Sequence, residues 1–86
     1  MRLYFHKEFE KQYRKLRKNE QQKVLERIIL FQENHLDPIL ENHSLQGKYF
    51  GYRSINIAGD LRAIFIKIGI DEYRFVKVGS HSELYR

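Results

Sequence analysis

The sequence contains no cysteine, a single proline and no long hydrophobic run. Without cysteine, the chain can form neither a disulfide framework nor a thiolate zinc site, and it has no thiol nucleophile. Its longest apolar runs are four residues, at Ile28–Phe31 and Ala63–Ile66, whereas a membrane-spanning helix needs about 20. The first residues are too polar to form the apolar core of a signal peptide. We therefore expect a cytoplasmic protein with no membrane partner.

The charge balance favours anionic partners. The 86 residues include 16 Lys and Arg against 11 Asp and Glu, which gives a formal net charge of +5 at pH 7. A small basic domain is suited to a polyanion or to an acidic protein, although the same excess also serves simple solubility. At this length, and without internal repeats or a flexible linker, we expect one domain over residues 1–86.

The N-terminal half is predicted to contain a short strand and two helices. Alternation of polar and apolar side chains over Arg2–His6 indicates the strand. Over residues 7 to about 18, apolar residues recur with the spacing of one helix face, while the other face is strongly basic. Asn19, with Gln22 as its capping-box partner, is the expected N-cap of the second helix, which must stop before Pro38. The two helices should therefore form a hairpin.

The C-terminal half is predicted to be an antiparallel meander of three strands. Polar and apolar residues alternate over Arg53–Ile57, and two further runs, 61–68 and 72–78, are bounded by turn residues. Gly79 and Ser80 are expected to break the last strand. The predicted order is β-α-α-β-β-β and the fold class is α+β, with the helical hairpin on one face of the sheet. The position of the N-terminal strand within the sheet does not follow from the sequence.

Two of the four histidines, His43 and His81, are the main candidates for chemistry. None of the histidines has a metal-ligand spacing and no carboxylate cluster accompanies them, so we expect no metal site. His43 precedes the second strand and His81 follows the last one, so each is expected in a loop, where functional residues tend to collect. In a meander, both positions can reach one edge of the sheet.

Basic residues accompany these histidines, and Lys48 and Arg53 would help to make one end of the sheet positively charged. Arg62 interrupts an apolar strand, so it either pairs with Asp60 or projects toward solvent or a ligand. If these groups converge, they suffice for metal-free RNA cleavage, because imidazoles can transfer the protons and a fixed cation can stabilise the phosphorane. Tyr85 would then stack on a base or orient the phosphate.

Several short motifs resemble the RelE/ParE superfamily of bacterial toxins. In chain order they are His43-Ser-Leu-Gln-Gly47, Gly51-Tyr52-Arg53, Asp60-Leu61-Arg62-Ala-Ile-Phe65, Val78-Gly79-Ser80-His81 and Glu83-Leu84-Tyr85. Their order and spacing are most similar to those of the RelE/YafQ-type mRNA interferases of type II toxin–antitoxin systems. The resemblance implies a twisted antiparallel sheet with two helices on one face. It also implies an enzyme that cuts mRNA in the ribosomal A site without metal or other cofactor, and that a cognate antitoxin silences.

The resemblance further implies roles for individual residues. His43, Asp60 and His81 match two histidines and an acidic residue of the YafQ-like active site. Arg62 matches the strand arginine of the RelE branch, where it is proposed to stabilise the transition state. Tyr85 falls where the family has an aromatic residue near the end of the chain. From this resemblance we expect the two histidines to share the proton transfers with the assistance of Asp60, without an assignment of which histidine is the base. Arg62 and Lys77 are expected to stabilise charge, which makes six predicted catalytic residues with Tyr85.

Three positions depart from the pattern of the YafQ-like toxins. Lys77 stands where those toxins have an arginine, so the charge is kept but bidentate geometry is lost. Asn56 occupies a position where they can carry another histidine, and Leu61 replaces an aromatic neighbour of the acidic residue. The last two departures weaken the transfer of mechanism and codon preference.

The basic face of the first helix has two interpretations. It is either an ordinary solvated face or a surface that contacts ribosomal RNA phosphates through salt-sensitive, sequence-independent binding. An antitoxin could occupy the same surface, or cover the active end of the sheet with an acidic amphipathic segment. The expected RNA-binding residues are Lys11, Arg14, Lys15, Lys18, Lys48 and Arg53.

Two alternatives to the interferase hypothesis remain at this point. One is a ParE-like toxin that inhibits DNA gyrase by protein binding and needs no acid–base residues, so the pair His43 and His81 counts against it. The other is a non-catalytic RNA-binding domain of the same fold, which the departures at Asn56 and Leu61 keep open.

Overall fold

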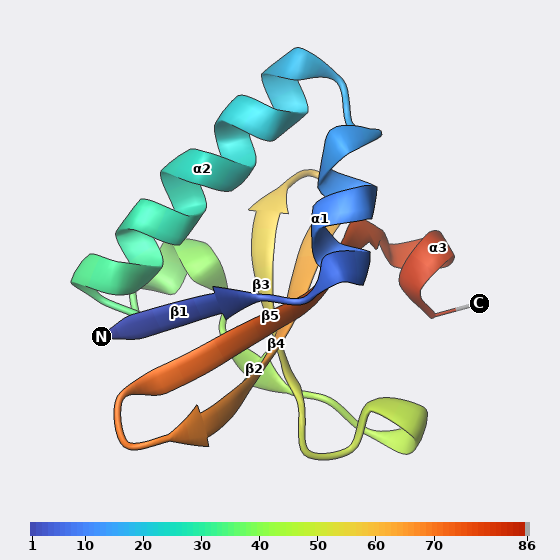
Figure 1. Cartoon of the computed structure of the whole chain (residues 1–86). Helices are drawn as coiled ribbons and strands as arrows, with labels where there is room; N and C mark the ends of the chain where they lie inside the picture. Colours follow the sequence, from blue (N-terminus) through green and yellow to red (C-terminus); the bar gives the residue numbers. More distant parts are fainter. Residues whose placement is uncertain (86) are drawn as a thin grey trace.

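Two helices cover one face of a five-stranded sheet (Figure 1). The computed structural model describes residues 1–85 of the chain. Short 3-10 turns at Pro38–Leu40 and Gly47–Tyr49 lie on either side of β2. The predicted α+β fold, with two helices after an N-terminal strand, is confirmed. In chain order the elements are β1 (Arg2–Phe5), α1 (Lys7–Arg14), α2 (Lys18–Glu33), β2 (His43–Ser44), β3 (Arg53–Ala58), β4 (Leu61–Gly69), β5 (Glu72–Ser80) and α3 (His81–Leu84).

The strand order β1-β5-β4-β3-β2 places the N-terminal strand at one edge, beside the last strand. β1 runs parallel to β5, with Arg2 opposite Glu72, and the other neighbouring pairs are antiparallel. The ammonium group of Met1 lies 2.8 Å from the carboxylate of Asp71, just before β5. β5 is therefore an inner strand, bonded to β1 on one side and to β4 on the other.

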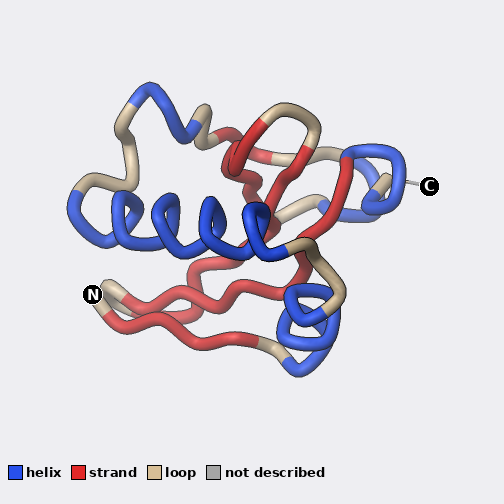
Figure 2. Tube along the Cα trace, turned by 90° about the horizontal axis from the view of Figure 1, so that it is seen from above, coloured by secondary structure: helices blue, strands red, loops and turns tan. Residues whose placement is uncertain are grey.

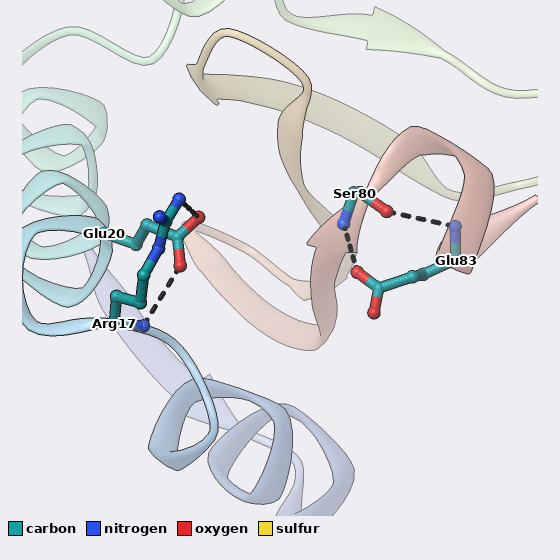
Figure 3. Close-up of polar contacts among 4 residues, drawn as sticks. All are labelled: Arg17, Glu20, Ser80 and Glu83. Carbon is teal, nitrogen blue, oxygen red and sulfur yellow. Dashed lines mark hydrogen bonds and ion pairs between the residues drawn. The ribbon is translucent and has the colours of Figure 1, made fainter.

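The two helices are separated by a longer connection than the sequence predicted. α1 ends at Arg14, where the N–H groups of Lys15 and Leu16 donate to carbonyls three residues earlier and tighten the last turn. α2 begins at Lys18 with Arg17 as its N-cap, so the predicted N-cap at Asn19 is wrong. The reason is Glu20, whose carboxylate accepts the N–H of Arg17 at 3.0 Å (Figure 3). A carboxylate at the third helical position thus selects the start of the helix.

The second half of the chain contains two elements beyond the predicted meander. His43 and Ser44 form β2, which pairs with β3, so His43 lies in a strand and not in a loop. Gly79 and Ser80 do not break β5, because Ser80 keeps an extended backbone and stays in register with Leu61. The chain then turns directly into α3. Ser80 Oγ accepts the N–H of Glu83 at 3.2 Å, and the Glu83 carboxylate accepts the N–H of Ser80 at 2.8 Å (Figure 3).

Apolar side chains pack on both faces of the sheet. The larger cluster lies beneath α1 and α2, and Figure 2 shows α2 lying beside the strands of the sheet. Its fully buried members include Phe31, Leu40, Ile55, Ile57, Ala63 and Phe75. The opposite face, which we call the outer face, carries a smaller buried cluster of Leu45, Ile64 and Leu84. Because no long helix covers the outer face among residues 1–85, this face is where side chains can meet a ligand.

Candidate active site on the outer face

Four of the six predicted catalytic residues line one hollow of about 440 Å³ on the outer face. They are His43 from β2, Arg62 from β4, His81 from α3, and Tyr85 just after α3. The residues are spread along the second half of the chain. The sheet brings them together because β2, β3, β4 and β5 are successive neighbours, and α3 continues from the end of β5. We call this depression the histidine hollow.

The ring of His43 is held in one orientation by the backbone. Its Nδ1 lies 2.7 Å from the carbonyl oxygen of Glu41. A carbonyl only accepts hydrogen bonds, so Nδ1 carries the proton and, in the neutral ring, Nε2 is left as a proton acceptor. Glu41 has a left-handed backbone, with φ of 47°, at the end of the 3-10 turn Pro38–Leu40. A left-handed backbone is strained in a residue other than glycine, and such strain often occurs at functional sites. Here it occurs two residues before His43.

His81 is positioned by the turn between β3 and β4. Its backbone N–H donates to the carbonyl oxygen of Asp60 at 3.0 Å, which ties the start of α3 to that turn. Its ring lies 4.6 Å from the ring of Tyr85, four residues later on the same helical face. Tyr85 in turn meets the ring of Tyr49 edge-on, with centroids 5.6 Å apart.

A hydrogen bond from Tyr49 holds the C-terminal end of α3. Its hydroxyl donates to the carbonyl oxygen of Leu84 at 2.9 Å. Burial raises the pKa of Tyr49, so the hydroxyl keeps its proton, and with it this hydrogen bond, well above neutral pH. The last turn of the described chain is therefore anchored at both ends, by Asp60 through His81 and by Tyr49 through Leu84.

Arg62 is oriented by an amide and not by a carboxylate. Its Nη1 donates to Oδ1 of Asn56 at 2.6 Å, across the β3–β4 ladder. Of the two interpretations for Arg62, the ion pair with Asp60 is not found among residues 1–85, whereas the side chain does line the histidine hollow, where a ligand could bind. The amide carries no charge, so this contact orients the guanidinium at the edge of the histidine hollow without neutralising it.

The other two predicted catalytic residues lie outside this hollow. Asp60 lines a separate depression, which Arg17, Glu20, Ser80 and Glu83 also border. Its contact with the site is the backbone hydrogen bond to His81.

Lys77 also lies outside the histidine hollow. It lines a second depression on the outer face, together with Lys48. His43, Arg62, His81 and Tyr85 therefore share one depression, whereas Asp60 and Lys77 line other depressions.

The predicted RNA-binding residues are dispersed. Arg53 is used internally, because its Nε donates to Oδ1 of Asn42 at 2.8 Å and holds the segment before β2. The Nζ of Lys48 lies 5.2 Å from the ring centre of Tyr49. The other four predicted residues are all exposed: Lys11 and Arg14 in α1, Lys15 just after it, and Lys18 at the start of α2.

One further residue of the histidine hollow has no signal in the sequence. Ser54 lines it, is 0 % exposed, and lies directly opposite His43 in the β2–β3 pair. Its Oγ has no hydrogen-bond partner among residues 1–85, although buried hydroxyls are normally bonded. A serine within an alternating strand is typical of an ordinary surface position, so only the three-dimensional structure reveals this unbonded hydroxyl.

Residues 1–85 contain neither a metal-binding cluster nor a membrane-spanning helix. Residues 1–85 contain no group of three or more His, Asp or Glu side chains placed to hold a metal ion. No helix within them has the length and apolar character needed to cross a membrane.

Comparison with known proteins identifies the family. Residues 1–86 match the protein-family model described as bacterial toxin of type II toxin-antitoxin system, YafQ. The fold is similar to that of YafQ from Escherichia coli BL21(DE3), at 22% identity, full coverage of both chains and a TM-score of 0.83. A conserved hypothetical protein from Helicobacter pylori is 28% identical over 98% of both chains, with a TM-score of 0.68. No curated protein sequence matches the chain.

A third similar structure contains a partner. In the Escherichia coli DinJ–YafQ toxin–antitoxin complex, the matching chain is 24% identical. The match covers 98% of the present chain and 96% of the other, with a TM-score of 0.79.

Proposed function

Because the chain belongs to the YafQ family of bacterial type II toxins, we propose that it is a ribosome-dependent endoribonuclease that cleaves mRNA and stops translation. One toxin domain over residues 1–86 would carry the activity. The observation that supports this proposal is the histidine hollow, where two imidazoles, a guanidinium and an aromatic ring line one depression. Such a set supplies proton transfer, charge stabilisation and stacking for a single nucleotide.

The proposed reaction uses the ribose 2′-hydroxyl as nucleophile. Nε2 of His43 takes the 2′-hydroxyl proton while the 2′-oxygen attacks the phosphorus. Protonated His81 gives a proton to the 5′-oxygen as its bond to phosphorus breaks. The products are a 2′,3′-cyclic phosphate and a 5′-hydroxyl end, so the proton count is unchanged overall. The Nδ1 hydrogen bond of His43 supports its role as the base, because it leaves Nε2 free to accept.

The remaining candidates support these two groups. Arg62 stabilises the negative charge that develops on the phosphorane, a contribution of about 10²–10³ in rate for comparable donors. Tyr85 stacks on the nucleotide base beside His81. Asp60 acts as a positioning residue through the N–H of His81. Lys77 binds phosphate next to the histidine hollow and does not touch the scissile bond.

The partners follow from the same proposal. The toxin would act in the cytoplasm on mRNA in the ribosome, with exposed cations on and beside α1 in contact with RNA phosphates. A cognate antitoxin protein would bind and silence it, and the similar DinJ–YafQ structure is a complex of this kind, between a toxin and an antitoxin. The net charge of +5 suits both kinds of partner.

The decisive experiment is primer extension on mRNA in translating ribosomes, with the wild-type protein and His81→Ala. Cuts within codons should appear with the wild type and fall at least about 10²-fold in the variant, because a general acid contributes that much. His35→Ala is the matched control, since this histidine packs its ring against Phe31, away from the histidine hollow. Circular dichroism of each variant checks that the fold is kept.

Other results would favour the alternatives. Growth arrest without any cut, and retained in His81→Ala, would support a ParE-like toxin, and supercoiling by purified DNA gyrase would then be the next assay. RNA binding by the wild-type protein without cleavage on ribosomes would support a non-catalytic RNA-binding domain.

A further inference from the structure

A second depression on the outer face, of about 580 Å³, lies beside the histidine hollow. We propose that it binds the nucleotide next to the cleaved one in single-stranded RNA, with cations on its phosphate and tyrosine rings beside its base. The proposal rests on the proposed ribonuclease function and identifies a separate subsite for it. Its main residues are Lys48, Tyr49, Tyr52, Arg74 and Lys77.

The charge of this subsite is positive. Three cations line it, Lys48, Arg74 and Lys77, against one carboxylate, Glu8. Arg74 and Lys48 are exposed, and Lys77 is partly buried. Cations that converge on one depression form a phosphate-binding surface, and they draw in nucleic acid by a salt-dependent term that needs no particular sequence.

Aromatic rings line the same depression. Tyr49 and Tyr52 are both partly buried and meet each other edge-on, with ring centroids 6.3 Å apart. Rings beside cations are the usual arrangement in proteins that bind single strands, because every base offers a face for stacking. A base-paired duplex keeps its bases stacked inside, so the aromatic rings favour a single strand.

The subsite is continuous with the histidine hollow. Tyr49 lines the subsite and touches Tyr85, which lines the histidine hollow. The sheet makes a second connection, because His43, Ser54, Ile64 and Lys77 are cross-strand neighbours in one row. Lys77 therefore stands at the β5 end of the row that begins at His43, and one RNA strand can contact both depressions.

Arg74 is the residue that tests the subsite best. It lies on the neighbouring row, opposite Ile66, and takes no part in the proposed chemistry. Lys67→Glu is a matched control, because Lys67 is also an exposed cation of the sheet but lies opposite Tyr73, which belongs to the cluster beneath the helices. Both substitutions change the net charge by the same amount.

The first experiment measures binding of a short 2′-O-methyl RNA by fluorescence anisotropy, since this modification removes the nucleophile and prevents cleavage. Arg74→Glu should raise Kd by about tenfold or more, and should reduce the slope of log K against log salt by about 0.7. Lys67→Glu should change Kd by less than about threefold. Equal effects of the two substitutions would overturn the subsite, as would a wild-type protein that does not bind this RNA.

The second experiment leaves the protein unchanged and removes one base at a time from the same RNA. Loss of the base beside the tyrosines should weaken binding by about tenfold, as for other stacked bases. Equal loss at every position would contradict a stacking subsite.

These results separate the subsite from the enzyme. Wild-type cleavage on ribosomes together with Arg74-independent binding would overturn the subsite and leave the ribonuclease in place. Arg74-dependent binding without any cleavage would support the RNA-binding subsite and overturn the ribonuclease function.

Discussion

Asn56 has a chemical consequence for Arg62 that a carboxylate in its place would not have. Its amide oxygen accepts one hydrogen bond from the guanidinium but carries no charge. Arg62 is thus oriented without being neutralised, and its other N–H groups can reach a phosphate. The departure at Asn56 from the YafQ-like pattern is therefore compatible with a functional arginine, contrary to what its sequence alone suggested.

Ser54 yields a prediction at the same scale. A buried hydroxyl without a partner costs stability, so Ser54→Ala should leave the free energy of unfolding unchanged or raise it by about 1 kcal/mol. If the hydroxyl gains its partner from bound substrate, cleavage on ribosomes should fall by about tenfold in the same variant. Urea unfolding and primer extension measure the two effects.

Ser82→Ala provides a control for Ser54→Ala, because Ser82 is an exposed serine of α3. It should change cleavage little. A clear loss of stability in Ser54→Ala would contradict the prediction, since it would mean that the hydroxyl is already bonded in the free protein.

At the scale of elements, two helices begin with the same device. In each, a glutamate at the third helical position accepts the N–H of the N-cap residue, Glu20 for α2 and Glu83 for α3 (Figure 3). The first cap fixes the corner between α1 and α2, and the second fixes the helix that carries His81. Both caps border the depression that also contains Asp60.

The cap of α2 predicts a pH dependence. The backbone N–H of Arg17, and then its side chain, bond the Glu20 carboxylate and hold its pKa below the usual 4.5. A lowered pKa in the folded state means that the stabilisation is present above about pH 4.5 and is lost as pH falls through the lowered value. Glu20→Gln should therefore lower the urea midpoint near pH 7, and lower it by less near pH 3.

A control for this prediction lies at the other end of the same helix. Glu33 is exposed at the C-terminus of α2, where a negative charge opposes the helix dipole. Glu33→Gln should leave the urea midpoint near pH 7 unchanged or raise it. A midpoint for Glu20→Gln that stays below the wild type by the same amount at both pH values would contradict a charge-dependent cap.

The sequence predicted elements wherever a periodic pattern was long enough. The alternation over Arg53–Ile57 and the helical spacing in the first half both correspond to observed elements. β2 was missed because two residues carry no period, and only pairing with β3 creates the strand. The end of β5 was missed because Gly79 and Ser80 are turn residues by composition, yet the ladder to β4 keeps them extended.

The candidate site was predictable only in part for a related reason. Motif order pointed to His43, Arg62, His81 and Tyr85, which line one hollow. The partners of these residues depend on cross-strand register, which the sequence does not contain. Asn56 as the partner of Arg62, and the separation of Lys77 from the histidine hollow, follow from the registers of β3, β4 and β5.

At the scale of the whole molecule, β1 can join the sheet only by pairing with β5. β1 pairs with β5 across a separation of 70 residues, from Arg2 to Glu72 (72 − 2). Contacts of such long range form late in folding. Nascent chains that expose residues 1–71 outside the ribosome should therefore stay sensitive to protease, whereas chains that expose 1–86 should resist it. Full protection of the 1–71 chains would contradict this order of events.

The inner position of β5 also has a consequence for truncated products of translation. Any product of premature termination before residue 72 lacks the strand that joins β1 to β4, and it lacks His81 and Tyr85 as well. Incomplete synthesis thus yields fragments in which β1 has no neighbouring strand and the histidine hollow lacks two of its lining residues. Under the proposed mechanism these fragments lack the general acid and the stacking ring and should not cleave mRNA, so truncated products of translation should be inactive.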